Sequence, residues 1–81
     1  MGGEELAERI AEMVVAVNVL MRKKGAAGLE VRVVKDAGRL WIRTDQVDRD
    51  GTRRMRQESP ELGPQQALDY LEKLRAALGK A

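Results

Sequence analysis

The sequence contains no cysteine, no histidine and no phenylalanine. Without cysteine the chain has neither disulfides nor thiolate metal sites, and without histidine it lacks the commonest ligand of transition metals. We therefore expect neither a metal nor a cofactor. A chain of 81 residues is also only marginally stable by itself, because it buries roughly 60–65% of the surface that its unfolded form exposes. Since disulfides and such metals are excluded, association with a second copy is the usual source of stability that remains.

Long apolar runs are lacking too. The longest apolar segment, residues 13–21, is interrupted by Asn18 and is shorter than the roughly 20 residues that a membrane span needs. The N-terminal region is acidic, with Glu4, Glu5 and Glu8, whereas a secretory signal begins with basic residues. We therefore expect a cytoplasmic protein that has no membrane partner.

Groups that carry catalysis are scarce as well. No recognisable base accompanies the hydroxyl side chains, which are Thr44, Thr52, Ser59 and Tyr70. Several aspartates precede Gly51, but a calcium-binding loop with this glycine at its sixth position would need acids where Gln46 and Gln57 stand. We therefore expect that the protein is not an enzyme.

A long helix is predicted for residues 3–24. Its apolar residues recur at three- and four-residue spacing, at Leu6, Ile10, Met13, Val14, Val17, Leu20 and Met21. Glutamates stand in its first turns and basic residues in its last, where each suits the helix dipole. Gly25 is expected to end the helix, because glycine readily adopts the left-handed conformation that follows a helix.

Three strands and a second helix are predicted to follow. The strands cover residues 29–35, 39–46 and 52–58, separated by the turn sequences Asp36-Ala37-Gly38 and Asp48-Arg49-Asp50-Gly51. Such short connections favour an antiparallel meander. The second helix covers residues 64–78, beginning at Pro64. We expect a single small α+β domain over residues 1–81, ordered helix–strand–strand–strand–helix, with both helices packed on one face of the sheet.

The first helix has more apolar residues than this core can cover. The expected core combines one stripe of each helix with the inward residues of the sheet: Leu6, Ile10, Met13, Val17 and Leu20; Ala67, Leu68, Leu71, Leu74 and Leu78; Leu29, Val31, Val33, Leu40, Ile42 and Met55. Val15, Val19 and Met21 are then left over, so we expect a homodimer that forms through this helix. Asn18 would either fix the register of the helix pair or face solvent. Two alternatives stay open: the second helix covers both faces of the first, or a different protein does.

Arginines around one tryptophan are predicted on the opposite face of the sheet. If Leu40 and Ile42 point inward, strand alternation turns Trp41 outward, together with Arg32, Arg39, Arg43, Arg54 and Arg56. Guanidinium groups beside an aromatic ring suit phosphates and bases, so nucleic acid or an acidic protein is an expected partner. Alternatively, these arginines only stack on Trp41 and shield it, and nearby carboxylates such as Asp45 dilute their charge.

Two resemblances also imply a nucleic-acid partner. Residues 39–78 resemble the DNA-binding regions of phage and transposon integrases, in which a basic hairpin runs into a helix rich in alanine and leucine. The matching segments are Arg39-Leu-Trp-Ile-Arg43, Asp50-Gly51, Arg53-Arg-Met-Arg56 and residues 67–78, whereas the first helix and first strand fall outside that pattern. The order of elements is similar to that of double-stranded RNA-binding domains, although Pro64-Gln65-Gln66 replaces the basic start of their second helix.

These observations favour a small, non-catalytic interaction or regulatory protein that forms a homodimer through its first helix. A nucleic-acid-binding regulator that uses the arginine and tryptophan face is the first alternative. A designed sequence whose only role is to fold is the second, although designers prefer stronger helix formers than the valines of residues 14–19 and more ideal loops than residues 57–66.

Overall fold

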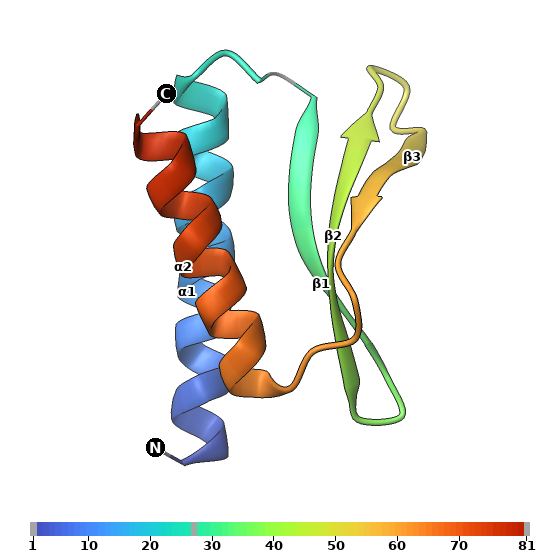
Figure 1. Cartoon of the computed structure of the whole chain (residues 1–81). Helices are drawn as coiled ribbons and strands as arrows, with labels where there is room; N and C mark the ends of the chain where they lie inside the picture. The colour runs from blue at the N-terminus through green and yellow to red at the C-terminus, as the bar shows by residue number, and fades with distance from the viewer. Residues whose placement is uncertain (1, 27, 81) are drawn as a thin grey trace.

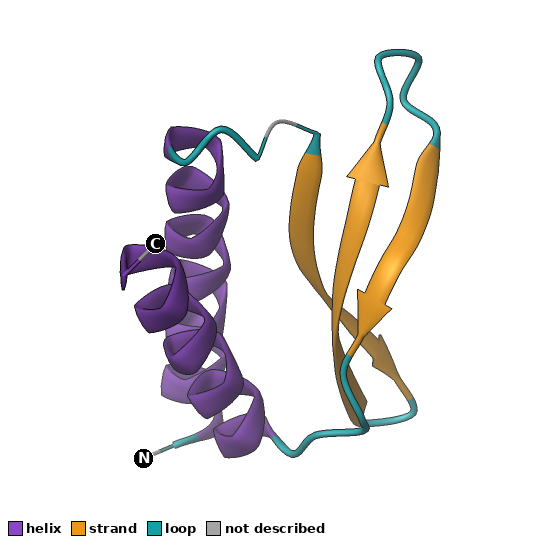
Figure 2. Cartoon of the chain, turned by 45° about the horizontal axis from the view of Figure 1, so that its top comes forward, coloured by secondary structure: helices purple, strands orange, loops and turns teal. Residues whose placement is uncertain are grey.

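Two helices and three strands make up the structure, a computed structural model that describes residues 2–26 and 28–80. Along the chain they are α1 (Gly3–Lys23), β1 (Leu29–Asp36), β2 (Arg39–Val47), β3 (Arg53–Glu58) and α2 (Pro64–Lys80). The strands form one antiparallel sheet in the order β1-β2-β3. Both helices lie on one side of this sheet (Figure 1), and none of the described elements covers its opposite face (Figure 2). The predicted fold is confirmed.

Gly25 ends α1, as predicted. It has a φ of 81°, and its N–H donates a hydrogen bond to the carbonyl of Arg22 at 3.2 Å. The N–H of Ala26 donates to the carbonyl of Met21 at 3.0 Å. The two bonds satisfy carbonyls that the end of a helix otherwise leaves without a partner.

The start of α2 is stabilised by the residues around Pro64. The N–H of Gly63 donates to Oε1 of Gln66 at 2.8 Å, so this side chain satisfies a donor just ahead of the helix. Proline at the first helical position loses no hydrogen bond there. The chain reaches this point through a loop that is held against β2, because the buried hydroxyl of Ser59 accepts a hydrogen bond from the N–H of Ile42 at 2.8 Å.

The turn between β1 and β2 places two residues in the left-handed region. Gly38 has a φ of 78° and Ala37 a φ of 50°. Two successive positive φ angles match the hairpin turn whose twist fits that of the strands. Glycine adopts this conformation freely, but the Cβ of Ala37 crowds the neighbouring carbonyl and so makes the turn less stable than it could be.

The β2–β3 hairpin turns at Gly51, which has a φ of 87° and donates its N–H to the carbonyl of Asp48 at 2.9 Å. The Oδ1 of Asp50 accepts a hydrogen bond from the N–H of Thr52 at 2.9 Å. Because this bond favours the charged carboxylate, it holds the pKa of Asp50 below its ordinary value. The predicted hairpin is present.

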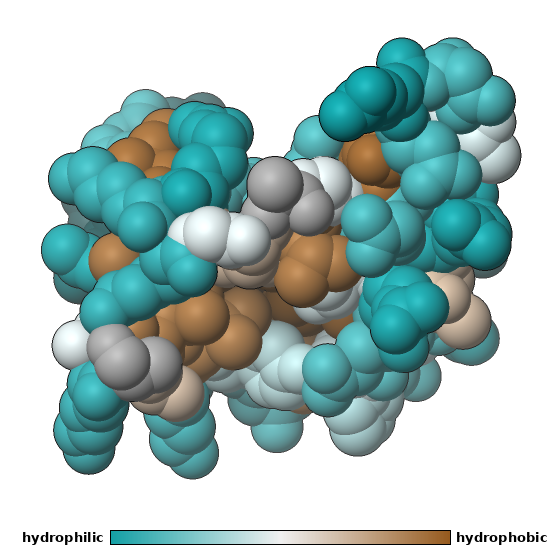
Figure 3. Space-filling view, turned by 90° about the horizontal axis from the view of Figure 1, so that it is seen from above, coloured by the Kyte–Doolittle hydropathy of each residue, from teal (hydrophilic) through white to brown (hydrophobic). Residues whose placement is uncertain are grey.

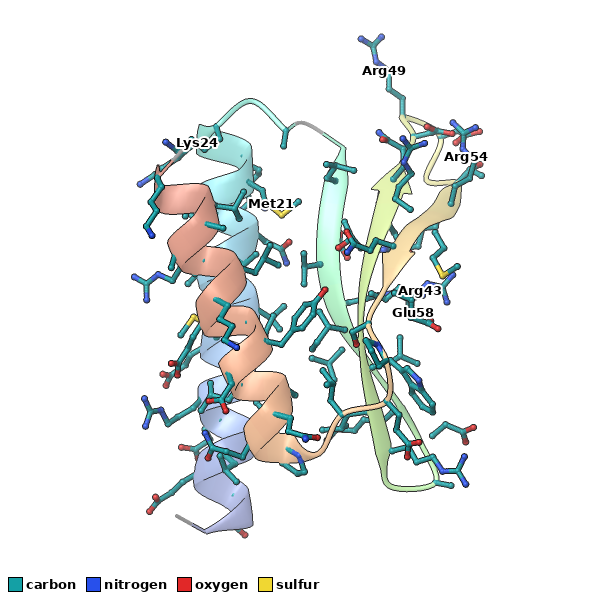
Figure 4. All side chains as sticks on the ribbon, viewed as in Figure 1. Met21, Lys24, Arg43, Arg49, Arg54 and Glu58 are labelled. Carbon is teal, nitrogen blue, oxygen red and sulfur yellow. The ribbon has the colours of Figure 1, made fainter. Side chains whose placement is uncertain are left out.

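The core lies between the helix pair and the inner face of β1 and β2. Its buried hydrophobic residues are Ile10, Val17, Met21, Val31, Leu40, Ile42, Ala67, Leu68 and Leu71. Met21 is 5% exposed and points from α1 toward the sheet (Figure 4). The prediction that Met21 is left outside the core is therefore wrong, and Leu20, which was expected inside, instead borders a groove between the helices.

Asn18 explains why α1 is turned in this way. Its amide nitrogen donates to the carbonyl of Val31 at 2.9 Å, and its Oδ1 accepts from the N–H of Val31 at 2.8 Å. These bonds draw the Asn18 side of α1 toward β1, which brings Met21 inward and moves Leu20 outward. Both ends of the Asn18 amide are engaged within the chain, so this side chain does not simply face solvent. Its role in the register of a helix pair stays a prediction.

β3 contains an irregularity that changes which of its side chains share a face. Thr44 of β2 lies opposite Gln57, whereas Asp45 lies opposite Met55, so Arg56 is an extra residue between them. Such a bulge shifts the alternation of one strand relative to its neighbour. Met55, predicted for the core, is instead 52% exposed on the outer face. That prediction is wrong, because β3 contacts neither helix within the described residues.

Candidate binding surfaces

The outer face of the sheet is built from cross-strand pairs. Arg32 of β1 lies opposite Arg43 of β2, and Val34 lies opposite Trp41. Paired residues of an antiparallel sheet share a face. Because Leu40 and Ile42 are buried on the helix side, Arg39, Trp41 and Arg43 point away from the helices, as predicted.

A buried carboxylate organises this face. Asp45 is 0% exposed. Its Oδ2 accepts a hydrogen bond from Nε of Arg32 at 2.9 Å and its Oδ1 accepts one from Nε of Arg43 at 3.1 Å. The Nη1 of Arg53 lies 3.6 Å from Oδ2. Asp45 therefore stabilises two arginines that would otherwise repel each other across neighbouring strands.

Arg53 completes the cluster from β3. Its Nη1 also donates to Oε1 of Glu30 at 3.0 Å, and this contact raises the pKa of the Arg53 guanidinium. Regular alternation along β3 puts Arg54 and Arg56 on this face, so the sequence-based prediction missed Arg53. The bulge at Arg56 has no glycine to mark it, and strand alternation alone could not locate it.

The other predicted arginines lie apart from this cluster. Nε of Arg39 is 3.6 Å from Glu61. Arg54 pairs with Gln46 on the helix-side face, and its Nη2 is 3.4 Å from Asp48 near the hairpin tip (Figure 4). The prediction that Arg54 shares the outer face is therefore wrong, and Arg56, the extra residue of the bulge, has no partner in the strand register.

The outer face consequently carries mixed charge, with two cationic ends exposed. Within the described residues, no hydrogen bond or ion pair engages the Nη atoms of Arg32 or Arg43. The two side chains are 42% and 31% exposed. Asp45 thus fixes each guanidinium at its Nε and leaves its outer end available to a ligand, beside Trp41 on the same face.

A second surface runs along α1. Val15 is 63% exposed and belongs to a row at four-residue spacing that includes Ala7, Ala11 and Val19. Residues four apart lie on the same side of a helix. Val19 borders a groove of about 890 Å³ between the helices, lined also by Met13, Ala16, Leu20, Ala76 and Gly79. Viewed from above, hydrophobic residues also show at the surface between the helix layer and the sheet (Figure 3).

In comparisons with known proteins, no family model, no curated protein and no solved structure matches this chain. Across residues 2–26 and 28–80, no group of three or more acidic side chains is arranged to hold a metal ion. Over the same residues, neither helix has the length and apolar character of a membrane span.

Proposed function

We propose that this protein is a non-catalytic interaction protein that acts as a homodimer through the α1 surface. The observation that carries the proposal is Val15, a large hydrophobic residue that is 63% exposed in the middle of a long helix. The small, exposed residues Ala7 and Ala11 precede it in the same row. A small domain without cysteine gains stability when such a row is covered by a partner.

The proposal retains Val15 and Val19 from the predicted interface, without Asn18 and Met21. Asn18 is engaged with Val31, and Met21 is buried against the sheet. The interface is accordingly centred nearer the middle of α1 than the sequence suggests.

Light scattering at micromolar concentration tests this function. The expected mass is twice the 9.0 kDa of one chain. Val15→Glu should yield monomers, because dimerisation would bury an unpaired carboxylate. Met55→Glu is the matched control, since Met55 is the other large hydrophobic residue exposed in the described part of the chain, and it should leave the dimer intact. A monomeric wild-type protein would contradict the proposal.

A second candidate function is nucleic-acid binding by the outer face of the sheet. The observation that favours it is the pair of guanidinium groups that Asp45 holds in place with their Nη ends exposed. Two preorganised arginines next to an aromatic ring can bind a phosphate while a base stacks nearby.

Trp41 provides the assay for this candidate, because it is the single tryptophan of the chain. Binding of DNA or RNA oligonucleotides should change its fluorescence, and the affinity should fall with salt. The double variant Arg32→Gln/Arg43→Gln should reduce the slope of log K against log salt by about 2 for duplex DNA, since each phosphate contact contributes about 0.9. Arg9→Gln/Arg75→Gln removes the same charge from the helix layer and should have no such effect. Unchanged fluorescence at low salt would rule out this candidate.

A further inference from the structure

β1 leaves one side of the sheet open. The order β1-β2-β3 gives it a neighbour on a single side. Asn18 binds both main-chain groups of Val31, so these groups point away from β2. Because main-chain groups alternate along a strand, those of Val33 and Lys35 point the same way. No described residue hydrogen bonds to them, so two N–H and two carbonyl groups are available to another strand.

An apolar groove runs beside these open groups. It has a volume of about 510 Å³ and lies between α1 and the sheet, with Ala7, Ile10, Ala11, Val14, Val33 and Lys35 in its lining. A strand that pairs with β1 would therefore gain main-chain hydrogen bonds and place alternate side chains against this lining.

We propose that the strand that pairs with this edge is β1 of a second copy, running antiparallel, with Val34 opposite the partner's Val34. This inference rests on the proposed homodimer and specifies how it forms. In this register Val33 lies opposite the partner's Lys35, and Lys35 lies opposite the partner's Val33. The two pairs use all the open main-chain groups, and the two sheets become one six-stranded sheet.

Charge favours this register over its neighbours. Arg32 comes opposite the partner's Asp36, and by symmetry the opposite-charge pair occurs twice. A two-fold axis at Val33 would instead set Glu30 against the partner's Asp36 and would require main-chain groups that Asn18 occupies. An axis at Lys35 would place two lysines opposite each other.

The same two-fold axis brings the two α1 helices together at their small residues. Asn18 and Val31 lie at the same height along the α1 axis, because they are hydrogen bonded to each other. α1 runs antiparallel to β1 (Figure 1). The three residues from Val31 to Val34 advance about 10 Å, which equals about seven helical residues, so Ala11 lies level with Val34. In the proposed dimer Ala11 therefore lies at the same height as the partner's Ala11, and Ala7 lies at the same height as the partner's Val15. Alanine at the crossing point permits an interaxial distance near 8 Å, so the exposure of Val15 and the open edge of β1 have one common explanation.

A single introduced cysteine tests the register, because the chain itself contains none. Val34→Cys would place two thiols at a directly opposed, non-hydrogen-bonded pair, whose Cα atoms lie about 4.5 Å apart, within the Cα separations that disulfides span. Under mild oxidation it should form a covalent dimer at least about tenfold faster than Met55→Cys, since the non-covalent dimer holds its thiols at high effective concentration. Equal rates for the two variants would overturn the β1 pairing.

Charge reversal gives an independent result. Asp36→Lys alone and Arg32→Glu alone should each lose the dimer, and a mixture of the two should recover it as a heterodimer, because opposite charges face each other only in the mixed pair. Arg32→Glu also removes a partner of the buried Asp45, so circular dichroism first establishes that both variants are folded. Failure of the two folded variants to associate would also overturn the pairing. A wild-type dimer with neither cross-linking nor heterodimer recovery would refute this interface and leave the homodimer proposal standing, whereas a monomeric wild type would refute both.

Discussion

Replacing Asn18 with alanine removes the contact that aligns α1 with the sheet. The side chain forms two hydrogen bonds with Val31, of 2.8 and 2.9 Å, and each contributes about 1 kcal/mol to stability. Alanine recovers about 0.6 kcal/mol because it is the better helix former. The expected net loss is about 1.4 kcal/mol, which lowers the melting temperature of a chain this size by about 6–11 °C.

Thermal denaturation followed by circular dichroism, at one protein concentration throughout, measures this loss. Asn18→Asp should be less stable than Asn18→Ala, because the carboxylate loses the donor and sets negative charge against the carbonyl of Val31. Glu12→Ala is an exposed control on the same helix and should change stability by less than about 0.5 kcal/mol. If Asn18→Ala has the same melting temperature as Glu12→Ala, then Asn18 does not position α1, and the explanation for the burial of Met21 fails.

Three further predictions concern the outer face, the first hairpin and pH. Asp45→Asn should lower stability by about 2–3 kcal/mol in chemical denaturation, because a buried amide cannot accept hydrogen bonds from two guanidinium groups without turning its NH₂ toward one of them; a neutral result would contradict the organising role of this carboxylate. Ala37→Asn should raise stability by about 0.5–1 kcal/mol, since asparagine tolerates the left-handed conformation better than alanine, and a decrease would argue against the positive φ at this turn. Because folding lowers the pKa of Asp50, its contribution is present above the unfolded-state pKa and is lost as the pH falls through the folded-state pKa. The melting difference between wild type and Asp50→Asn should therefore shrink in acid, and a difference that grows there would contradict the assigned contact.

The parts of the fold that could be predicted from sequence are those set by local signals. Helical periodicity, Gly25 and Pro64 place α1 and α2, and glycine-containing turns place the hairpins. Each of these signals acts within a few residues and depends little on the rest of the chain.

The missed features depend on contacts between distant segments. The rotation of α1 follows from Asn18 reaching Val31, so a count of apolar residues could not choose between Leu20 and Met21. The buried position of Asp45 requires arginines from all three strands, whereas charge counting treats that aspartate only as a diluent. The face of Arg53 depends on a bulge that its own strand does not signal.

The bulged strand β3 also bears on how far assembly could proceed. Its six residues are all exposed and mostly charged, and the extra residue Arg56 interrupts its register. A strand with these properties is a poor template for another strand, because its main chain is irregular and charges would repel a like neighbour. Pairing through β1 would thus consume the one regular edge of each copy. Growth would stop at two chains, and the combined sheet would end on both sides in a strand that resists fibre formation.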